Sequence, residues 1–193
     1  MAEAPTVTIS LPPIQDRCPT CHERYVFLEH PMRPGVPMMA TCACTRGPDH
    51  KWDKRFLELA QLISTWSKDP STQVGCVLVG KGRAIHSTGY NGFPRGVADD
   101  DRLHDREKKY PLVVHAEENA VLNATSTGAS LNGCVSYGTW PPCTRCARLY
   151  IQAGVREVVS PKKDIPERWQ ADFDRARGFL IEAGVKVRVV DVG

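Results

Sequence analysis

An alternation of helix-like and strand-like segments fills the second half of the chain and limits the folds that it can adopt. Helical patterns are predicted at residues 115–125, 142–154 and 172–184, and strand patterns at residues 133–137, 156–160 and 185–190. Successive parallel strands need a crossover connection, which is usually a helix, so this order requires a largely parallel sheet with helices on its faces. We therefore predict an α/β fold in three layers, α/β/α.

The first half of the ordered region adds one helix and two antiparallel strands. Residues 52–67 place apolar side chains at helical spacing, and Pro70 cannot continue the helix. Two β-rich runs, at residues 73–80 and 83–90, are separated by a Lys-Gly pair that suits a hairpin. The central sheet is therefore predicted to be mixed and five-stranded. Residues 91–110 form a long charged loop, and a loop of that length is usually functional or mobile.

Six of the eight cysteines occur in short pairs, which in a cytosolic protein bind metal more often than they form disulfides. Four of them lie near the N-terminus and suit a tetrahedral structural zinc: Cys18, Cys21, Cys42 and Cys44. His22 could replace one of these ligands, and the alternative is a set of reduced thiols in a flexible arm. The predicted organisation is an N-terminal arm with a zinc knuckle, residues 1–50, followed by one domain, residues 51–193.

Composition narrows the class of protein. The net charge is only +3, with acids and bases interspersed, so charge gives no case for nucleic-acid binding. No apolar run approaches the roughly 20 residues needed to span a bilayer, and the N-terminus lacks a basic segment leading into an apolar one. We expect a cytoplasmic protein without a membrane partner. The remaining cysteines, Cys76 and Cys134, lie in apolar stretches and are predicted to be buried without a metal.

Two separated segments carry the candidate chemistry, His115-Ala116-Glu117 and Pro142-Cys143-Thr144-Arg145-Cys146. Both begin predicted helices after loops at one edge of the sheet. One helical turn separates the two cysteines, so both sulfurs can bind one ion, and His115 as third ligand leaves the fourth position open, as catalytic zinc sites require. Glu117 is placed to act as a general base and then as a general acid. A purely structural zinc site is the alternative, but it leaves Glu117 without a role.

The spacing H-x-E followed by P-C-x-x-C is the signature of zinc-dependent nucleobase deaminases. The chain further resembles the deoxycytidylate deaminase family of the cytidine-deaminase-like superfamily over roughly residues 52–190. The zinc motif by itself indicates only the superfamily. The resemblance rests on five segments, SKDPSTQVGC, GYNGFPRG, KYPLVVHAEENA, TWPPCTRCA and IQAGVREVV. The first two of them point specifically to the deoxycytidylate branch.

The resemblance implies further roles for individual residues. Asn91 is expected to hydrogen-bond the sugar, and the backbone amide of Ala116 to read the pyrimidine carbonyl. The 5′-phosphate is expected to contact residues of the first of these segments, Lys68, Ser71 or Thr72. Nucleotide effectors are expected to contact residues of the second, Gly92, Phe93 and Arg95.

The resemblance also implies regulation by dCTP and dTTP with Mg²⁺, and a homo-oligomer, with a hexamer favoured. Some relatives use a histidine of the long loop as a ligand of a second zinc, and His104 lies in that loop, although its charged neighbours favour a solvated position. Arg95 and Arg102 could likewise face a phosphate or be merely solvated.

The function predicted from these features is the zinc-dependent hydrolysis of dCMP to dUMP and ammonia, which supplies dUMP for thymidylate synthesis. Three alternatives remain open. The same chemistry suits a modified dCMP, dCTP or a free nucleoside, and a nucleic-acid-acting deaminase would use the N-terminal zinc module to grip RNA or DNA. A nucleotide sensor without activity is the third. The weak net charge and the absence of an aromatic and basic stripe disfavour nucleic acid as a partner.

Overall fold

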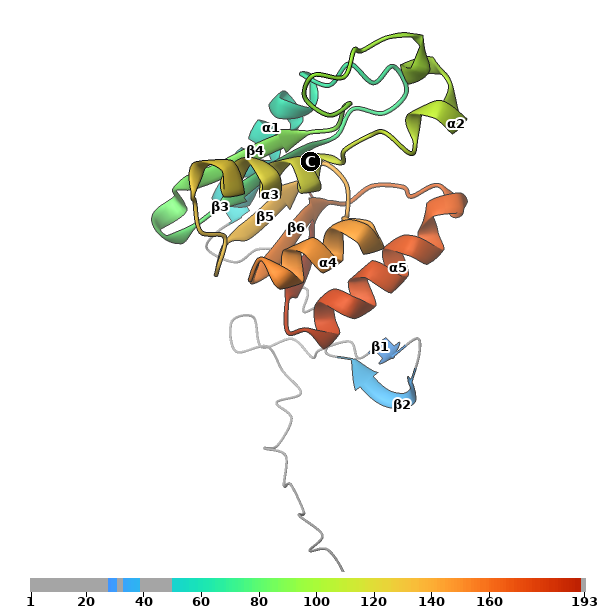
Figure 1. Cartoon of the computed structure of the whole chain (residues 1–193). Helices are drawn as coiled ribbons and strands as arrows, with labels where there is room; N and C mark the ends of the chain where they lie inside the picture. The colour runs from blue at the N-terminus through green and yellow to red at the C-terminus, as the bar shows by residue number, and fades with distance from the viewer. Residues whose placement is uncertain (1–27, 31–32, 39–49, 192–193) are drawn as a thin grey trace, which may run out of the picture.

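A computed structural model describes residues 28–30, 33–38 and 50–191 of the chain (Figure 1). The principal elements run in the order α1 (His50–Ser64), β3 (Gly75–Val79), β4 (Ile85–Tyr90), α3 (Ala116–Thr127), β5 (Val135–Gly138), α4 (Thr144–Gln152), β6 (Glu157–Pro161), α5 (Glu167–Glu182) and β7 (Lys186–Val190). Near the N-terminus, β1 (Leu28–His30) pairs antiparallel with β2 (Arg33–Met38). The predicted alternation of helices and strands is therefore present.

The sheet has five strands in the order β4-β3-β5-β6-β7. The hairpin strands β3 and β4 pair antiparallel, as do β3 and β5, whereas β5, β6 and β7 are mutually parallel. The parallel half is built by the crossover helices α4 and α5, and the antiparallel half by the tight hairpin, whose short helix η1 (Lys81–Arg83) includes Gly82 at a positive φ of 68°. The prediction of a mixed five-stranded sheet is confirmed.

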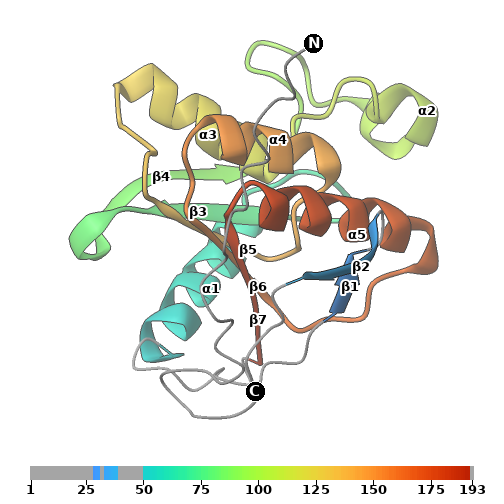
Figure 2. The same ribbon diagram turned by 90° about the horizontal axis from the view of Figure 1, so that it is seen from below.

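Alternate side chains of the buried strands serve two different cores, because successive residues of a strand point to opposite faces. In β3, Cys76 and Leu78 pack with α3, α4 and α5, whereas Val77 and Val79 pack with α1. Figure 2 shows α1 on one side of the sheet and α3, α4 and α5 on the opposite side. The predicted α/β/α arrangement is therefore correct, and Cys76 and Cys134 are fully buried, as expected.

Two segments differ most from their predictions. α5 begins at Glu167, five residues before its predicted start, and the long loop contains the short helices η2 (Asp101–His104) and α2 (Arg106–Lys109). Asp100 and Asp105 cap these short helices by accepting hydrogen bonds from backbone N–H groups, which is local chemistry that a search for apolar periodicity does not detect.

The four N-terminal cysteines and His22 lie outside the described residues. The proposed arm and its zinc site therefore stay predictions. Within the described part of the chain, no helix has the length and apolar composition needed to cross a membrane.

Candidate active site

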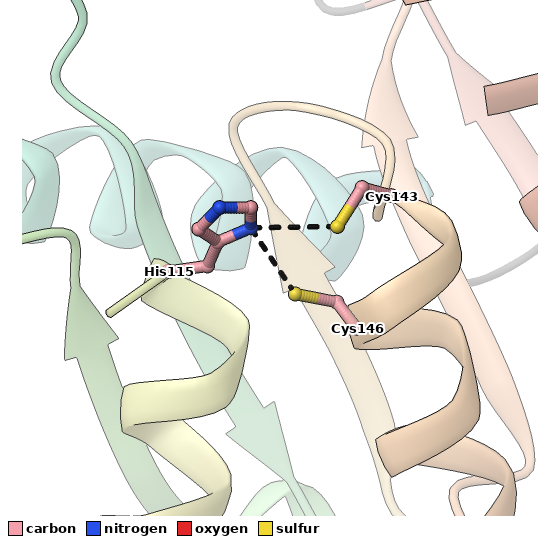
Figure 3. Close-up of side chains that lie close together, drawn as sticks. All are labelled: His115, Cys143 and Cys146. Atoms are coloured by element: carbon pink, nitrogen blue, oxygen red, sulfur yellow. Dashed lines mark hydrogen bonds between the residues drawn. The ribbon is translucent and has the colours of Figure 1, made fainter. Parts of the chain in front are cut away.

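Two helix N-termini from separate parts of the chain meet at the predicted metal site (Figure 3). His115 is the N-cap residue of α3, Cys143 is the N-cap residue of α4, and Cys146 lies in the first turn of α4. The Nδ1 atom of His115 lies 3.4 Å from Sγ of Cys143 and 3.5 Å from Sγ of Cys146. The three ligand atoms all lie within 4.8 Å of one another. The structure thus brings together the three predicted ligands.

This geometry fits zinc. Tetrahedral Zn²⁺ with bonds of about 2.3 Å to sulfur and about 2.0 Å to nitrogen places neighbouring nitrogen and sulfur ligands roughly 3.6 Å apart. The two observed nitrogen–sulfur distances lie close to that value. Within the described residues this is the only group of three or more histidine, cysteine or acidic side chains with metal-binding spacing. One imidazole and two thiols form a donor set typical of a catalytic zinc site with an open fourth position.

Glu117 is the acidic group beside the three ligands. Its side chain is almost fully buried, and its Oε2 atom lies 3.7 Å from Sγ of Cys146. Burial raises the pKa of the Glu117 carboxyl to about 7, because water is not available to solvate the charged form. A carboxyl group in this environment can both take up and release a proton near neutral pH.

The two thiols and the imidazole are electrostatically coupled. A hydrogen bond from the Cys146 thiol lowers the pKa of Cys143 to about 4, and the bond to His115 acts in the same direction. The same hydrogen bond between the two thiols, together with burial, raises the pKa of Cys146. The hydrogen bond to Cys143 also raises the pKa of His115. The site therefore favours at least one thiolate before any metal binds, and a metal ion would replace the shared proton.

Close packing against the sheet holds α3 in place. A Cβ atom at Gly89 of β4 would lie 2.3 Å from both the carbonyl oxygen of Ala116 and the amide nitrogen of Ala120, so only glycine permits this approach. Ser87 of the same strand donates a hydrogen bond to the carbonyl of Ala120 at 2.7 Å. The helix that carries His115 and Glu117 is thus fixed to the edge strand at its first turn.

A polar network around the buried residues Asp69, Asn91 and Lys109 joins several of the predicted substrate residues. Asp69 accepts hydrogen bonds from the backbone and side chain of Ser71 and from the backbone of Thr72, and it pairs with Lys109 at 3.0 Å. The Asn91 side chain accepts from the amide of Val74 at 2.7 Å and donates to the carbonyl of Thr72 at 2.9 Å. Asn91, Ser71 and Thr72 therefore share one network.

The other predicted contact residues lie apart from that network. Lys68 is exposed and pairs with Asp99 at 2.7 Å. Gly92 pairs with Val114 in an isolated bridge, the guanidinium of Arg102 lies over the ring of Phe93, and Arg95 hydrogen-bonds Asn123. His104 is exposed in η2, and the metal-binding group does not include it.

Sequence reasoning missed three polar residues near the site. Asp69 and Lys109 form a buried ion pair between segments 40 residues apart, and Asp172 of α5 hydrogen-bonds the first residue of α4. Asp69 had a local signal, since an aspartate side chain in a turn commonly accepts a hydrogen bond from the backbone two residues on. Lys109 and Asp172 had none, because both act across tertiary contacts.

Comparison with protein families gives a match to the model of the cytidine and deoxycytidylate deaminase zinc-binding region, over residues 50–161. The chain is 42% identical over 139 residues to an uncharacterized deaminase of Aliivibrio fischeri, and this alignment covers 71% of this chain and 92% of that protein. It is 40% identical over 128 residues to human deoxycytidylate deaminase, which covers 63% of this chain and 71% of the human protein.

A solved structure gives a similar result. The dCMP deaminase of cyanophage S-TIM5, determined in complex with dCMP and dUMP, is similar with a TM-score of 0.62 and 26% sequence identity. The similarity covers 75% of this chain and 98% of the phage protein. His115, Cys143 and Cys146 lie inside the region matched by the family model, whereas the four cysteines of the predicted second zinc site lie in residues 1–49, which precede it.

Proposed function

This chain belongs to the cytidine and deoxycytidylate deaminase family, and on this basis we propose that it hydrolyses dCMP to dUMP with release of ammonia. The observation that carries the proposal is the cluster of His115, Cys143 and Cys146 with the buried carboxyl of Glu117 beside it. The likeness to a phage dCMP deaminase that binds dCMP and dUMP supports a pyrimidine nucleotide as the substrate. The product would supply dUMP for thymidylate synthesis.

In the proposed mechanism His115, Cys143 and Cys146 hold the metal. Zinc bound there provides a Lewis acid that lowers the pKa of water and so supplies a nucleophile near neutral pH. Glu117 takes one proton from the attacking water and delivers it to N3 of the cytosine ring, and it then takes the second proton, from the hydroxyl formed at C4, and delivers it to the amine on C4. A bond from the water oxygen to C4 forms, the bond from C4 to the amine breaks, and ammonia leaves a carbonyl at C4.

Substrate binding is proposed to use the residues named from the family resemblance. The Ala116 N–H would donate to the pyrimidine carbonyl, and Lys68, Ser71 or Thr72 would contact the 5′-phosphate. Asn91 would contact the sugar through its Oδ1 atom, which accepts one hydrogen bond from Val74 and can accept a second, whereas its Nδ2 atom already donates to Thr72 and Asp69. The shared network supports a common role for Asn91, Ser71 and Thr72.

A substrate panel tests the proposal. Release of ammonia should be measured with dCMP, dCTP, deoxycytidine and a cytosine-containing oligonucleotide at equal concentrations, with the Glu117→Gln variant as the blank. We expect dCMP to give the highest kcat/KM. A preference for deoxycytidine or dCTP would make that compound, rather than dCMP, the substrate. Turnover of the oligonucleotide would favour a nucleic-acid-acting deaminase. Absence of turnover with all four compounds would contradict the proposed enzyme.

We also propose a second, structural zinc bound by Cys18, Cys21, Cys42 and Cys44 in an arm of residues 1–50 that precedes the deaminase domain of residues 51–193. The spacing of these cysteines supports it. Zinc should be counted per chain in the purified protein. Two ions per chain, falling to one in a Cys18→Ser and Cys21→Ser double variant, are expected; one ion in the parent protein would restrict metal to the deaminase domain.

Regulation and assembly complete the proposal. We infer a cytoplasmic homo-oligomer, with a hexamer favoured, in which dCTP and dTTP with Mg²⁺ act through contacts at Gly92, Phe93 and Arg95. The exposed position of Arg95 supports a role for it in binding a charged ligand. Saturation curves for dCMP with and without each effector, together with sedimentation equilibrium, test both parts. Identical curves would contradict the regulation, and a monomer would contradict the assembly.

A further inference from the structure

At the start of helix α4, one residue is both the N-cap and a predicted metal ligand. The first N–H groups of a helix have no partner within the helix, and the side chain of the N-cap residue commonly satisfies one of them. In α4 the N-cap residue is Cys143, whose sulfur faces His115 at 3.4 Å and makes no capping hydrogen bond. The first N–H of α4, that of Thr144, is instead bonded by a group from another helix.

Asp172 supplies that group from the neighbouring helix α5. Its Oδ2 atom accepts a hydrogen bond from the backbone N–H of Thr144 at 3.0 Å, and its Oδ1 atom accepts one from the Thr144 hydroxyl at 2.7 Å. The same hydroxyl lies 3.2 Å from the backbone carbonyl of Asp172. Arg175, one turn further along α5, lies 3.7 Å from the carboxylate. Thr144 is thus held at two atoms by one carboxylate.

Thr144 lies between the two cysteine ligands, so its contact with Asp172 affects how both sulfurs are placed. It follows Cys143 and precedes Cys146 by two residues, so fixing its backbone fixes the turn that carries both sulfurs. The third ligand, His115, comes from α3, and the distances from its Nδ1 atom to the two sulfurs depend on how that turn is placed. Outer partners of this kind orient metal ligands and commonly change metal affinity by about 10- to 100-fold.

We propose that Asp172 is a positioning residue for the zinc site, which bonds the first N–H of α4 and thereby fixes the turn that carries both cysteine sulfurs. The inference rests on the zinc site of the proposed function. It extends that site to a helix that contributes no ligand, and it assigns Thr144, one of the two variable positions of the P-C-x-x-C motif, a defined structural task.

The test measures zinc affinity rather than activity. Release of zinc from the full-length protein to a chromogenic chelator should be followed for the parent chain and for Asp172→Asn, Asp172→Ala, Thr144→Val and Thr144→Ser. The phase that disappears in His115→Ala identifies the zinc of this site. We expect affinity to fall about tenfold in Asp172→Ala. Asp172→Asn and Thr144→Val should lie between it and the parent, and Thr144→Ser should stay near the parent.

Asp174→Asn is the matched control, because Asp174 is exposed on the same helix and its carboxylate accepts a hydrogen bond from Gln170, one turn away on α5. Thermal unfolding of the zinc-free proteins measures any general loss of stability. Zinc affinity within twofold of the parent in Asp172→Asn and Thr144→Val, at whatever stability, would overturn the inference. Absence of the phase that depends on His115 would instead contradict the zinc site itself, so the two failures are distinguishable.

Discussion

The N-termini of α3 and α4 meet at one site but treat their free N–H groups differently. In both helices the N-cap residue is a predicted metal ligand, His115 or Cys143, and neither side chain caps its helix. The first N–H of α4, that of Thr144, is bonded by Asp172. The first N–H of α3, that of Ala116, has no such partner among the described residues. The first N–H of α4 is thus bonded within the protein, whereas the first N–H of α3 is available to a ligand.

This contrast shows how one turn of structure can serve two purposes. A helix N-terminus carries partial positive charge and favours groups that accept hydrogen bonds. At α4 a carboxylate of the protein occupies that position, which holds the cysteine turn still. At α3 the first N–H has no such partner. It lies beside Glu117, where the ring carbonyl of the proposed substrate would accept a hydrogen bond from it. Substitutions at and around both helix ends can test this contrast.

The largest effect is expected from Glu117→Gln at the open end. The amide keeps the size of the side chain but cannot take up a proton, so turnover should fall by roughly 10³-fold or more. Zinc content should be unchanged, because Glu117 is not among the three ligands. Steady-state ammonia release and zinc analysis measure both. Glu118→Gln, one residue along, is the control and should keep turnover; equal losses in the two variants would remove Glu117 from its assigned role.

Next in size is the loss of the ion pair that anchors the segment leading into α3. Lys109→Met leaves Asp69 buried without its cation and should lower the free energy of unfolding by about 3 kcal/mol at neutral pH. Lys108→Met, at an exposed neighbouring lysine, should cost far less. Urea unfolding of both variants gives the comparison. Equal costs would show that the buried pair does not stabilise this segment.

The same pair predicts a direction with pH. Burial alone would raise the pKa of Asp69, but the hydrogen bonds from Ser71 and Lys109 hold it below its usual value in the folded protein. A carboxyl whose pKa is lowered by folding stabilises the protein above the pKa of the unfolded chain, about 4, and loses that contribution as the pH falls further. The difference in the free energy of unfolding between the parent and Lys109→Met, measured by urea unfolding, should therefore shrink below about pH 4.

A pair of proline substitutions compares the two helix ends directly. Proline removes the backbone N–H yet suits the first position of a helix, and both preceding residues have extended backbone, as a residue before proline prefers. Ala116→Pro should raise KM for dCMP about tenfold, the effect of one lost hydrogen bond, and leave zinc affinity unchanged. Thr144→Pro should weaken zinc binding instead. The reverse pattern would exchange the roles given to the two ends.

The smallest effect is expected for the ion pair that bridges the two helices. Arg145 of α4 contacts Glu118 of α3 at 2.7 Å, but its side chain is 51% exposed. Exposed pairs stabilise proteins by less than about 1 kcal/mol, so Arg145→Gln should change the unfolding free energy by no more than that. Thermal unfolding and zinc release measure it. A loss of zinc affinity as large as that of Asp172→Ala would make this bridge, rather than the cap, the element that sets the ligand spacing.

Local patterns were enough to predict most of the fold and the metal-binding set. The α/β class and the mixed sheet follow from alternating periodicities, and the ligands from residues whose spacing is set within single helical turns. His115, Cys143 and Cys146 could therefore be assigned from their spacing alone. The start of α5 was missed by five residues, because its first turn follows Pro166 and carries mostly polar and aromatic side chains rather than an apolar stripe.

The reaction class follows from the amino-acid sequence alone, because the predicted zinc ligands and Glu117 lie in short motifs, and the family match agrees with that class. How those groups are held is a property of the tertiary structure. Asp172 reaches α4 across 28 residues of sequence, and Lys109 reaches Asp69 across 40. Such contacts leave no periodic trace along the chain, since each depends on the packing of elements whose relative positions are fixed only when the whole sheet and its helices have assembled.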